Sequence, residues 1–165
     1  MASAHAEATL LRVLKSPARA RVAQPAETAL RYAGAAAIVG VGAVHAQQYY
    51  GAFFSVVPVI GTLFLLSFIG AGFVAATLVA PVRRLGAGIG DLVLVLAALG
   101  GIGIAFGSLV SLLVSEYTPL FGFMESGYRL AVVLAIVFDV LSTVLLGAFI
   151  ALVVRAWLRP RTHSR

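Results

Sequence analysis

The chain has 165 residues, of which 61% are hydrophobic and 11% are charged, and its mean hydropathy is +1.04. The apolar residues come in helix-length blocks, which indicates an all-α integral membrane protein with one small bundle and no separate soluble domain. The chain has no cysteine, which excludes disulfides, thiolate metal sites and cysteine catalysis. The net charge is +6, but the arginines stand at the ends of apolar blocks, so membrane topology explains them and no nucleic-acid partner is expected.

Residues 1–30 form a basic, alanine-rich segment that we expect on the cytoplasmic side. Leu10, Leu11 and Leu14 fit one face of a short helix lying on the anionic inner leaflet, and a partly disordered tail is the alternative. The membrane domain is predicted at residues 31–157, followed by a basic cytoplasmic tail at residues 158–165.

The uncharged stretch from Tyr32 to Val82 is too long for one span of about 20 residues and suits two. The turn between the two is predicted at an aromatic cluster of the kind found at membrane interfaces. This cluster comprises Tyr49, Tyr50, Phe53 and Phe54, around Gly51. The first helix is therefore expected at about residues 32–50 and the second at about 56–80, with Pro58 in its first turn.

The second half of the chain contains two further apolar blocks. A flexible connector, LGAGIG, is expected before a third helix at about residues 91–114, whose N-terminal dipole would favour the Asp91 carboxylate. After a loop, a fourth helix is predicted at about residues 129–155. Its apolar run, Leu130 to Val154, is interrupted by a single carboxylate, Asp139, and is long enough to cross a hydrocarbon core of about 30 Å.

Small residues recur at every fourth position in the last two helices, and such stripes let neighbouring helices approach closely. We expect them to be helix-packing seams rather than ligand sites. The residues concerned are Gly103, Gly107 and Ser111 in the third helix and Ala135, Thr143 and Gly147 in the fourth.

The positive charges predict the orientation of the chain. With four spans, eleven fall on one side: Arg12, Lys15, Arg19, Arg21, Arg31, Arg83, Arg84, Arg155, Arg159, Arg161 and Arg165. Only Arg129 falls on the other side. The positive-inside rule therefore predicts that both termini of this multi-pass protein are cytoplasmic.

A depth calculation predicts a polar layer in the outer half of the bundle. At about 1.5 Å per residue, one polar side chain from each helix lies about 21 to 25 Å above the inner boundary: His45, Ser67, Ser108 and Asp139. The hypothesis is that Asp139 pairs with His45, assisted by Gln48, Ser108 or Ser142. Alternatively, His45 is an ordinary interfacial residue, and Asp139 joins helices, handles protons or ions, or contacts a ligand.

Motifs of catalysis are absent from the sequence. There is no HExxH, GxSxG or Walker loop, and GAGIGD at residues 86–91 follows a membrane helix rather than a strand. A haem held by two histidines would need a second buried histidine, but His5 and His163 are in the tails. We expect no catalytic residue, no metal site and no cofactor.

At residues 45–81, HAQQYYGAFFSVVPVIGTLFLLSFIGAGFVAATLVAP, the chain resembles a loosely defined group of small four-helix membrane proteins from high-GC Gram-positive bacteria. The resemblance rests on a histidine at the outer end of the first helix, an aromatic segment and an IGxLFLL-like entry into the second. It implies an architecture and no activity. The expected function is a non-enzymatic accessory or assembly subunit of a larger plasma-membrane complex, respiratory or lipid-transport machinery by analogy. The partners would be the bilayer and other subunits or further copies of the chain. The alternative is a small oligomeric transporter or proton-coupled channel that uses the His45 and Asp139 layer.

Overall fold

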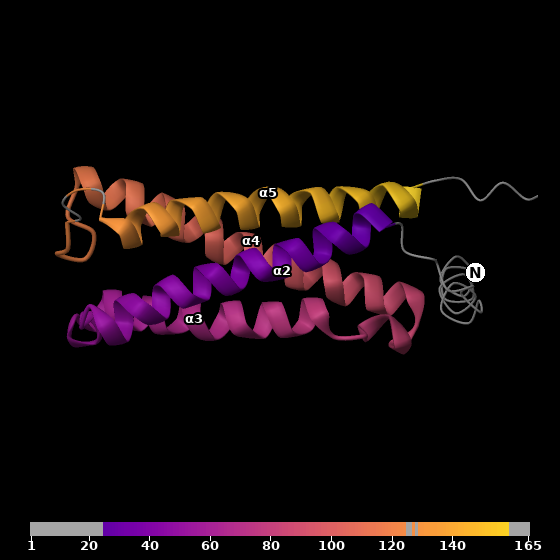
Figure 1. Cartoon of the computed structure of the whole chain (residues 1–165), viewed down its shortest axis with the longest axis horizontal. Helices are drawn as coiled ribbons and strands as arrows, with labels where there is room; N and C mark the ends of the chain where they lie inside the picture. Colours follow the sequence, from indigo (N-terminus) through magenta and orange to yellow (C-terminus); the bar gives the residue numbers. More distant parts are fainter. Residues whose placement is uncertain (1–24, 125–126, 128, 159–165) are drawn as a thin grey trace, which may run out of the picture.

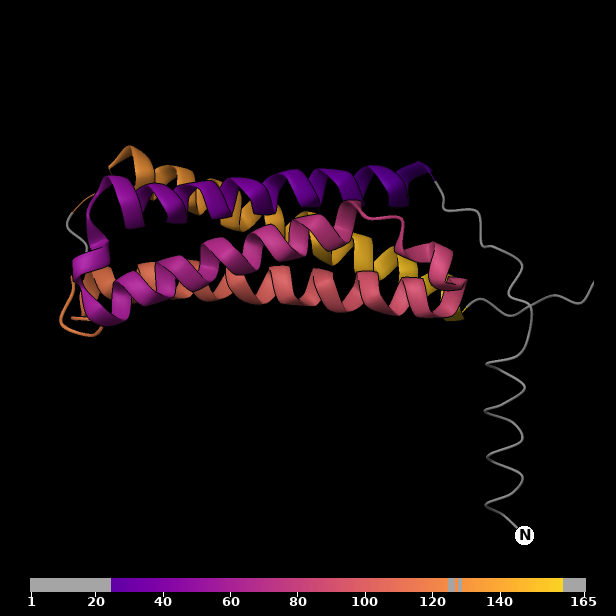
Figure 2. The same cartoon turned by 90° about the horizontal axis from the view of Figure 1, so that it is seen from below.

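The computed structural model describes residues 25–124, 127 and 129–158, and within these residues it is entirely helical. Four helices are long and apolar enough to cross a membrane. They are α2 (Pro25–Ala46), which continues into the π-helical turn η1 (Gln47–Gly51), α3 (Pro58–Val79), α4 (Ala87–Tyr117) and α5 (Leu130–Leu158). Successive helices run in opposite directions in an elongated bundle (Figures 1 and 2), with Pro25 and Leu158 at the same end. The predicted inner-leaflet helix at residues 10–14 and all but the first residue of the predicted tail lie outside the described residues.

The predicted four helices are confirmed, but several of their ends are shifted. The first begins at Pro25, where the fixed φ of proline suits a first helical turn. The fourth continues to Leu158 and the third to Tyr117. The turn after the first helix lies where it was predicted, and Pro58 occupies the first turn of α3.

The prediction of a flexible glycine-rich connector before the third helix is wrong. Val82–Leu85 form a short 3₁₀ helix, η3, and α4 begins at Ala87 inside the glycine stretch, directly after Gly86 with φ 114°. Gly90 explains why this order is stable. A Cβ atom there would lie 2.5 Å from the Cα atom of Arg83, so only glycine lets η3 pack directly against the first turn of α4.

Glycines also let α2 pack closely against α5. A Cβ atom at Gly34 would lie 2.5 Å from a Leu146 methyl group, and one at Gly40 would lie 2.4 Å from the Phe138 ring. The core that results is apolar and fully enclosed. Its largest members are Phe149, Ile38, Leu78, Leu94 and Leu146. The outward faces carry large apolar side chains such as Phe73, which is 74% exposed, as expected for helices surrounded by lipid.

The two ends of the bundle differ in character. The end that carries η3 also holds the first turn of α2 and the last turn of α5, and is called the η3 end below. The opposite end carries η1, the loop after α4 and the aromatic cluster, in which Phe54 makes edge contacts with the rings of Phe64 and Phe123 at centroid distances of 5.4 and 5.1 Å.

Candidate functional site

His45 is the central polar residue of the half of the bundle away from η3. It lies in the last turn of α2 and is 5% exposed. Its Nδ1–H donates to the backbone oxygen of Val41 at 2.8 Å, since a carbonyl oxygen can only accept. Its Nε2 atom lies 3.3 Å from the Ser108 hydroxyl on α4, and its ring meets the edge of Phe64 on α3. One imidazole therefore joins three helices.

Asp139 on α5 is completely buried, and the direct pair with His45 that the sequence predicted is not formed. Both ring nitrogens of His45 are engaged elsewhere. Neither carboxylate oxygen of Asp139 makes a hydrogen bond of standard geometry with a described residue, although the Ser108 hydroxyl lies next to it. The reason is the position of α4, which places Ser108 between the two groups. Ser142, one turn further along α5, is also buried, and its hydroxyl has no partner among the described residues.

The remaining residues of the predicted layer meet at one cavity. It has a volume of about 340 Å³ and touches all four long helices. Its polar lining consists of His45, Gln48, Ser67, Ser108, Ser111 and Ser115. Four of the six predicted layer residues are therefore gathered here, and Asp139 lies behind Ser108 rather than in the wall.

The small-residue stripe of α4 is not filled by another helix of the described chain, and its role as a packing surface for a partner stays a prediction. A Cβ atom at Gly103 or Gly107 would meet nothing within 4 Å, because both glycines face the cavity. Ser111 lies beside them and is exposed. The neighbouring face of α4 packs instead: a Cβ atom at Gly101 would lie 2.7 Å from a Leu146 methyl group.

The small residues predicted as a packing seam on α5 also differ in their surroundings. Ala135 lines the cavity, and the Thr143 hydroxyl donates to the Asp139 backbone oxygen at 2.8 Å. Gly147 is half-buried, and a Cβ atom there would again meet nothing within 4 Å. Among the three, only Gly147 stands where a neighbouring molecule could approach the helix backbone closely.

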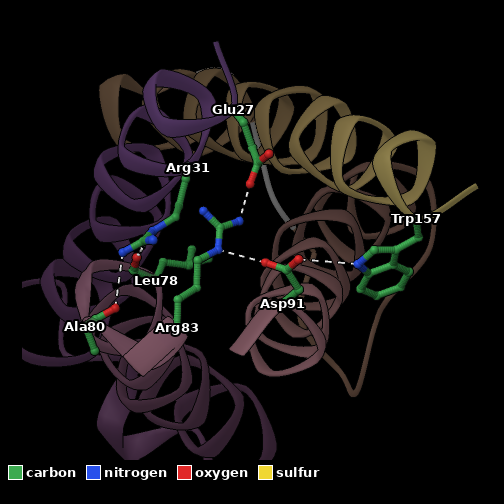
Figure 3. A network of polar contacts seen from close by, with 7 residues as sticks. All are labelled: Glu27, Arg31, Leu78, Ala80, Arg83, Asp91 and Trp157. Atoms are coloured by element: carbon green, nitrogen blue, oxygen red, sulfur yellow. Dashed lines mark hydrogen bonds and ion pairs between the residues drawn. The ribbon is translucent and has the colours of Figure 1, made fainter. Parts of the chain in front are cut away.

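The η3 end holds a second polar cluster, which is shown in Figure 3. Arg83 of η3 bridges two buried carboxylates: its Nη2 donates to Glu27 of α2 and its Nε donates to Asp91 of α4 at 2.7 Å. The indole N–H of Trp157 on α5 donates to the second oxygen of Asp91 at 3.3 Å. We call Glu27, Arg83, Asp91 and Trp157 the inner network. It ties α2, η3, α4 and α5 together at one level.

Arg31 connects α3 to this end of the bundle. Its Nε donates to the backbone oxygen of Leu78 at 2.5 Å, and its Nη2 donates to that of Ala80 at 3.1 Å. These carbonyls belong to the C-terminal turn of α3, which has no intrahelical donors for them. The positive charge of Arg31 near the negative, C-terminal end of the α3 dipole is also stabilising.

The electrostatics of the inner network favour a permanent guanidinium charge. Burial alone would lower the pKa of Arg83, which lies in η3 outside the four long helices. The hydrogen bonds and the charges of Glu27 and Asp91 outweigh burial and raise this pKa. Arg83 is therefore charged at every pH at which the protein is handled.

The inner network was not predicted, although one signal was present in the sequence. Arg83 lies just beyond the second predicted helix and Asp91 at the start of the third, and the prediction did not pair them. Glu27 is one turn before Arg31, so the same depth argument places it at this level too. Carboxylates at the boundary of two segments, with an arginine of a third segment at the same depth, predict an ion pair.

The arrangement at His45 differs from that of a Ser-His-Asp triad. In a Ser-His-Asp triad the histidine stands between the other two groups, so that it can take the serine proton while the carboxylate orients it. Here Ser108 stands in the middle. Within the described residues no group of three or more His, Asp or Glu side chains is placed to hold a metal ion.

Comparisons with known protein families, with curated protein sequences and with solved structures find no match for this chain. The fold and the two polar clusters define its class: an all-helical bundle with four helices of membrane-spanning length and composition.

Proposed function

We propose that the protein is a multi-pass protein of a bacterial plasma membrane with both termini in the cytoplasm. The support is the distribution of arginine over the described bundle. Arg31, Arg83, Arg84 and Arg155 lie toward the η3 end, whereas Arg129 lies at the opposite end. Positive residues that flank short loops remain on the cytoplasmic side, so the η3 end faces the cytoplasm.

Labelling of single cysteines tests this orientation, because the chain has none of its own. Leu85→Cys in η3 and Met124→Cys in the opposite loop both replace exposed side chains, which are 65% and 50% exposed. A membrane-impermeant maleimide should label Met124→Cys in intact cells and Leu85→Cys only after lysis. The reverse pattern would contradict the orientation.

We infer further that the chain is a non-enzymatic accessory or assembly subunit of a larger membrane complex. The observation that carries this proposal is the surface of α5 around Gly147. At several glycines of the bundle a neighbouring side chain fills the space of the missing side chain, as Leu146 does at Gly34, but a Cβ atom at Gly147 would meet nothing within 4 Å. Thr143 and Ala151 lie one turn to either side of it, so small side chains border the open position. In lipid, association of helices depends on such close backbone approach.

The test is purification of the tagged chain from its native membrane. We expect partner proteins in stoichiometric amounts with the natural chain, and loss of most of them with Gly147→Leu, whose side chain would hold a partner helix away. Gly72→Leu is the matched control, because Gly72 on α3 is exposed and equally free of neighbours. The Cβ atom of neither substitution would lie within 4 Å of another part of the described chain, so we expect both variants to fold. Equal recovery of partners with both variants would contradict the proposal.

A second candidate function, a small oligomeric transporter or proton-coupled channel, is favoured by the order His45, Ser108, Asp139. A neutral pair, in which the Asp139 carboxyl and His45 Nδ1 hold the protons, and a charged pair, in which His45 is an imidazolium and Asp139 a carboxylate, contain the same number of protons. A serine hydroxyl between them both donates and accepts, so it is suited to relay one. This candidate requires a homo-oligomer that moves protons across a liposome membrane, whereas the first requires a stable complex with other chains.

A further inference from the structure

The cavity beside His45 has an opening, and its exposed lining residues show where it lies. The cavity is walled by buried or half-buried residues on α2 and α5. On α3 and α4 several lining residues are exposed, among them Leu63, Gly103, Gly107 and Ser111. The glycines contribute no side chain to close the gap. The cavity therefore opens sideways, between α3 and α4, toward the region that lipid would occupy.

The chemistry of the lining is uncharged. None of the described residues around the cavity is Asp, Glu, Lys or Arg. Its inner wall carries the Gln48 amide and the Ser67 hydroxyl beside the His45 ring, whose two nitrogens already contact Val41 and Ser108, while Ser111 stands at the opening. The rest of the lining is aliphatic or aromatic. Such a surface can hydrogen-bond a hydroxyl or carbonyl group, but it offers no cation to a phosphate and no lining carboxylate to an amine.

The size and surroundings of the cavity add a second constraint. A volume of about 340 Å³ is at the lower end of the roughly 300–1,000 Å³ of small-molecule pockets, so it suits a head group and a short part of a chain. The flank of the opening on α3 is apolar and exposed, including Leu66, which is 59% exposed. A hydrocarbon chain leaving the opening would lie against this surface and among the membrane lipids.

We propose that the cavity binds a neutral single-chain amphiphile, entering from the membrane between α3 and α4, with a hydroxyl- or carbonyl-bearing head. The head lies near His45, Gln48 and Ser108, and the chain passes over Gly107. This site is independent of the α5 surface around Gly147, so failure of either proposal leaves the other standing.

Photocrosslinking of the full-length chain in nanodiscs tests the proposal. The probe is a monoacylglycerol with a diazirine close to its ester, and adducts are mapped by mass spectrometry. We expect adducts on residues 60–67 of α3 and 103–115 of α4, and at least a tenfold loss of adducts in Gly107→Leu, whose side chain would fill the opening. Gly72→Leu, on the lipid-facing side of α3, should keep the natural yield.

Competition identifies the head group. Excess monoolein should abolish the adducts, whereas lysophosphatidylglycerol with the same chain and octadecene without a head should not. Competition by the anionic lipid to the same extent would overturn the neutral-head assignment, and competition by octadecene would reduce the cavity to a gap filled by hydrocarbon. Adducts spread over the outer faces and unaffected by Gly107→Leu would overturn the site itself. If Gly107→Leu does not reconstitute, Ser111→Ala decides the matter, with a severalfold lower yield expected and an unchanged yield contradicting the site.

Discussion

Replacing Arg83 with alanine should destabilise the bundle by about 2 to 4 kcal/mol. Arg83 is the shared partner of Glu27 and Asp91, whose side chains are 2% and 4% exposed, and its removal takes away the guanidinium that both buried carboxylates contact. Loss of one partner from a buried ion pair costs about 3 to 5 kcal/mol, and the 22% exposure of the Arg83 side chain lowers the expected value. The measurement is reversible unfolding in mixed detergent and SDS, followed by circular dichroism.

Arg84 provides the matched control for this prediction. It is the next residue in η3, carries the same charge and is exposed. Arg84→Ala should change the unfolding free energy by no more than about 0.5 kcal/mol. In a double-mutant cycle, Glu27→Gln should cost less in the Arg83→Ala background than in the natural chain, because the two side chains contact each other. Equal effects of Arg83→Ala and Arg84→Ala would show that the inner network does not stabilise the protein.

The helices were predictable from the sequence because one physical signal dominates them. A block such as Leu130 to Val154 cannot satisfy its backbone in lipid except as a helix, so hydropathy alone predicts the element. The ends were less predictable because they depend on local packing. The start of α4 at Ala87 follows from the contact of Gly90 with Arg83, and a glycine-rich sequence does not reveal that contact.

For the polar layer, the sequence predicted the depth of the residues along the helices but not which of them are in contact. Residue spacing along a helix places His45, Ser108 and Asp139 at one level, and the structure brings all three together. The rotation of each helix about its axis decides which of them touch, and small residues on α4 left that rotation open. Gly101 and Gly107 are equally good seams by sequence, but only Gly101 meets a neighbouring helix. The cavity lies beside Gly107, where no side chain of a neighbouring helix fills the space.

Replacing Asp139 with valine should stabilise the isolated protein by about 1 to 3 kcal/mol. Asp139 is fully buried at a depth where a carboxylate costs about 2.5 to 3.5 kcal/mol on insertion scales, and no described residue gives it a hydrogen bond of standard geometry. A side chain without polar atoms removes this cost. Thr143→Val, one turn along the same helix, is the control and should change stability by less than about 1 kcal/mol, since it loses only a bond to its own helix backbone.

The same variant separates the two candidate functions, because a residue that lowers stability is retained only where it serves another purpose. If the chain moves protons, liposomes containing Asp139→Val should show no acid-driven proton uptake while the natural chain does. If the chain is instead an accessory subunit, proton uptake is absent from both and the variant keeps its partners on purification, because Asp139 is buried within the bundle and does not reach the surface around Gly147. A decrease in stability on Asp139→Val would contradict the claim that the buried carboxyl group destabilises the isolated protein. It would mean that this group has a stabilising partner in the folded chain.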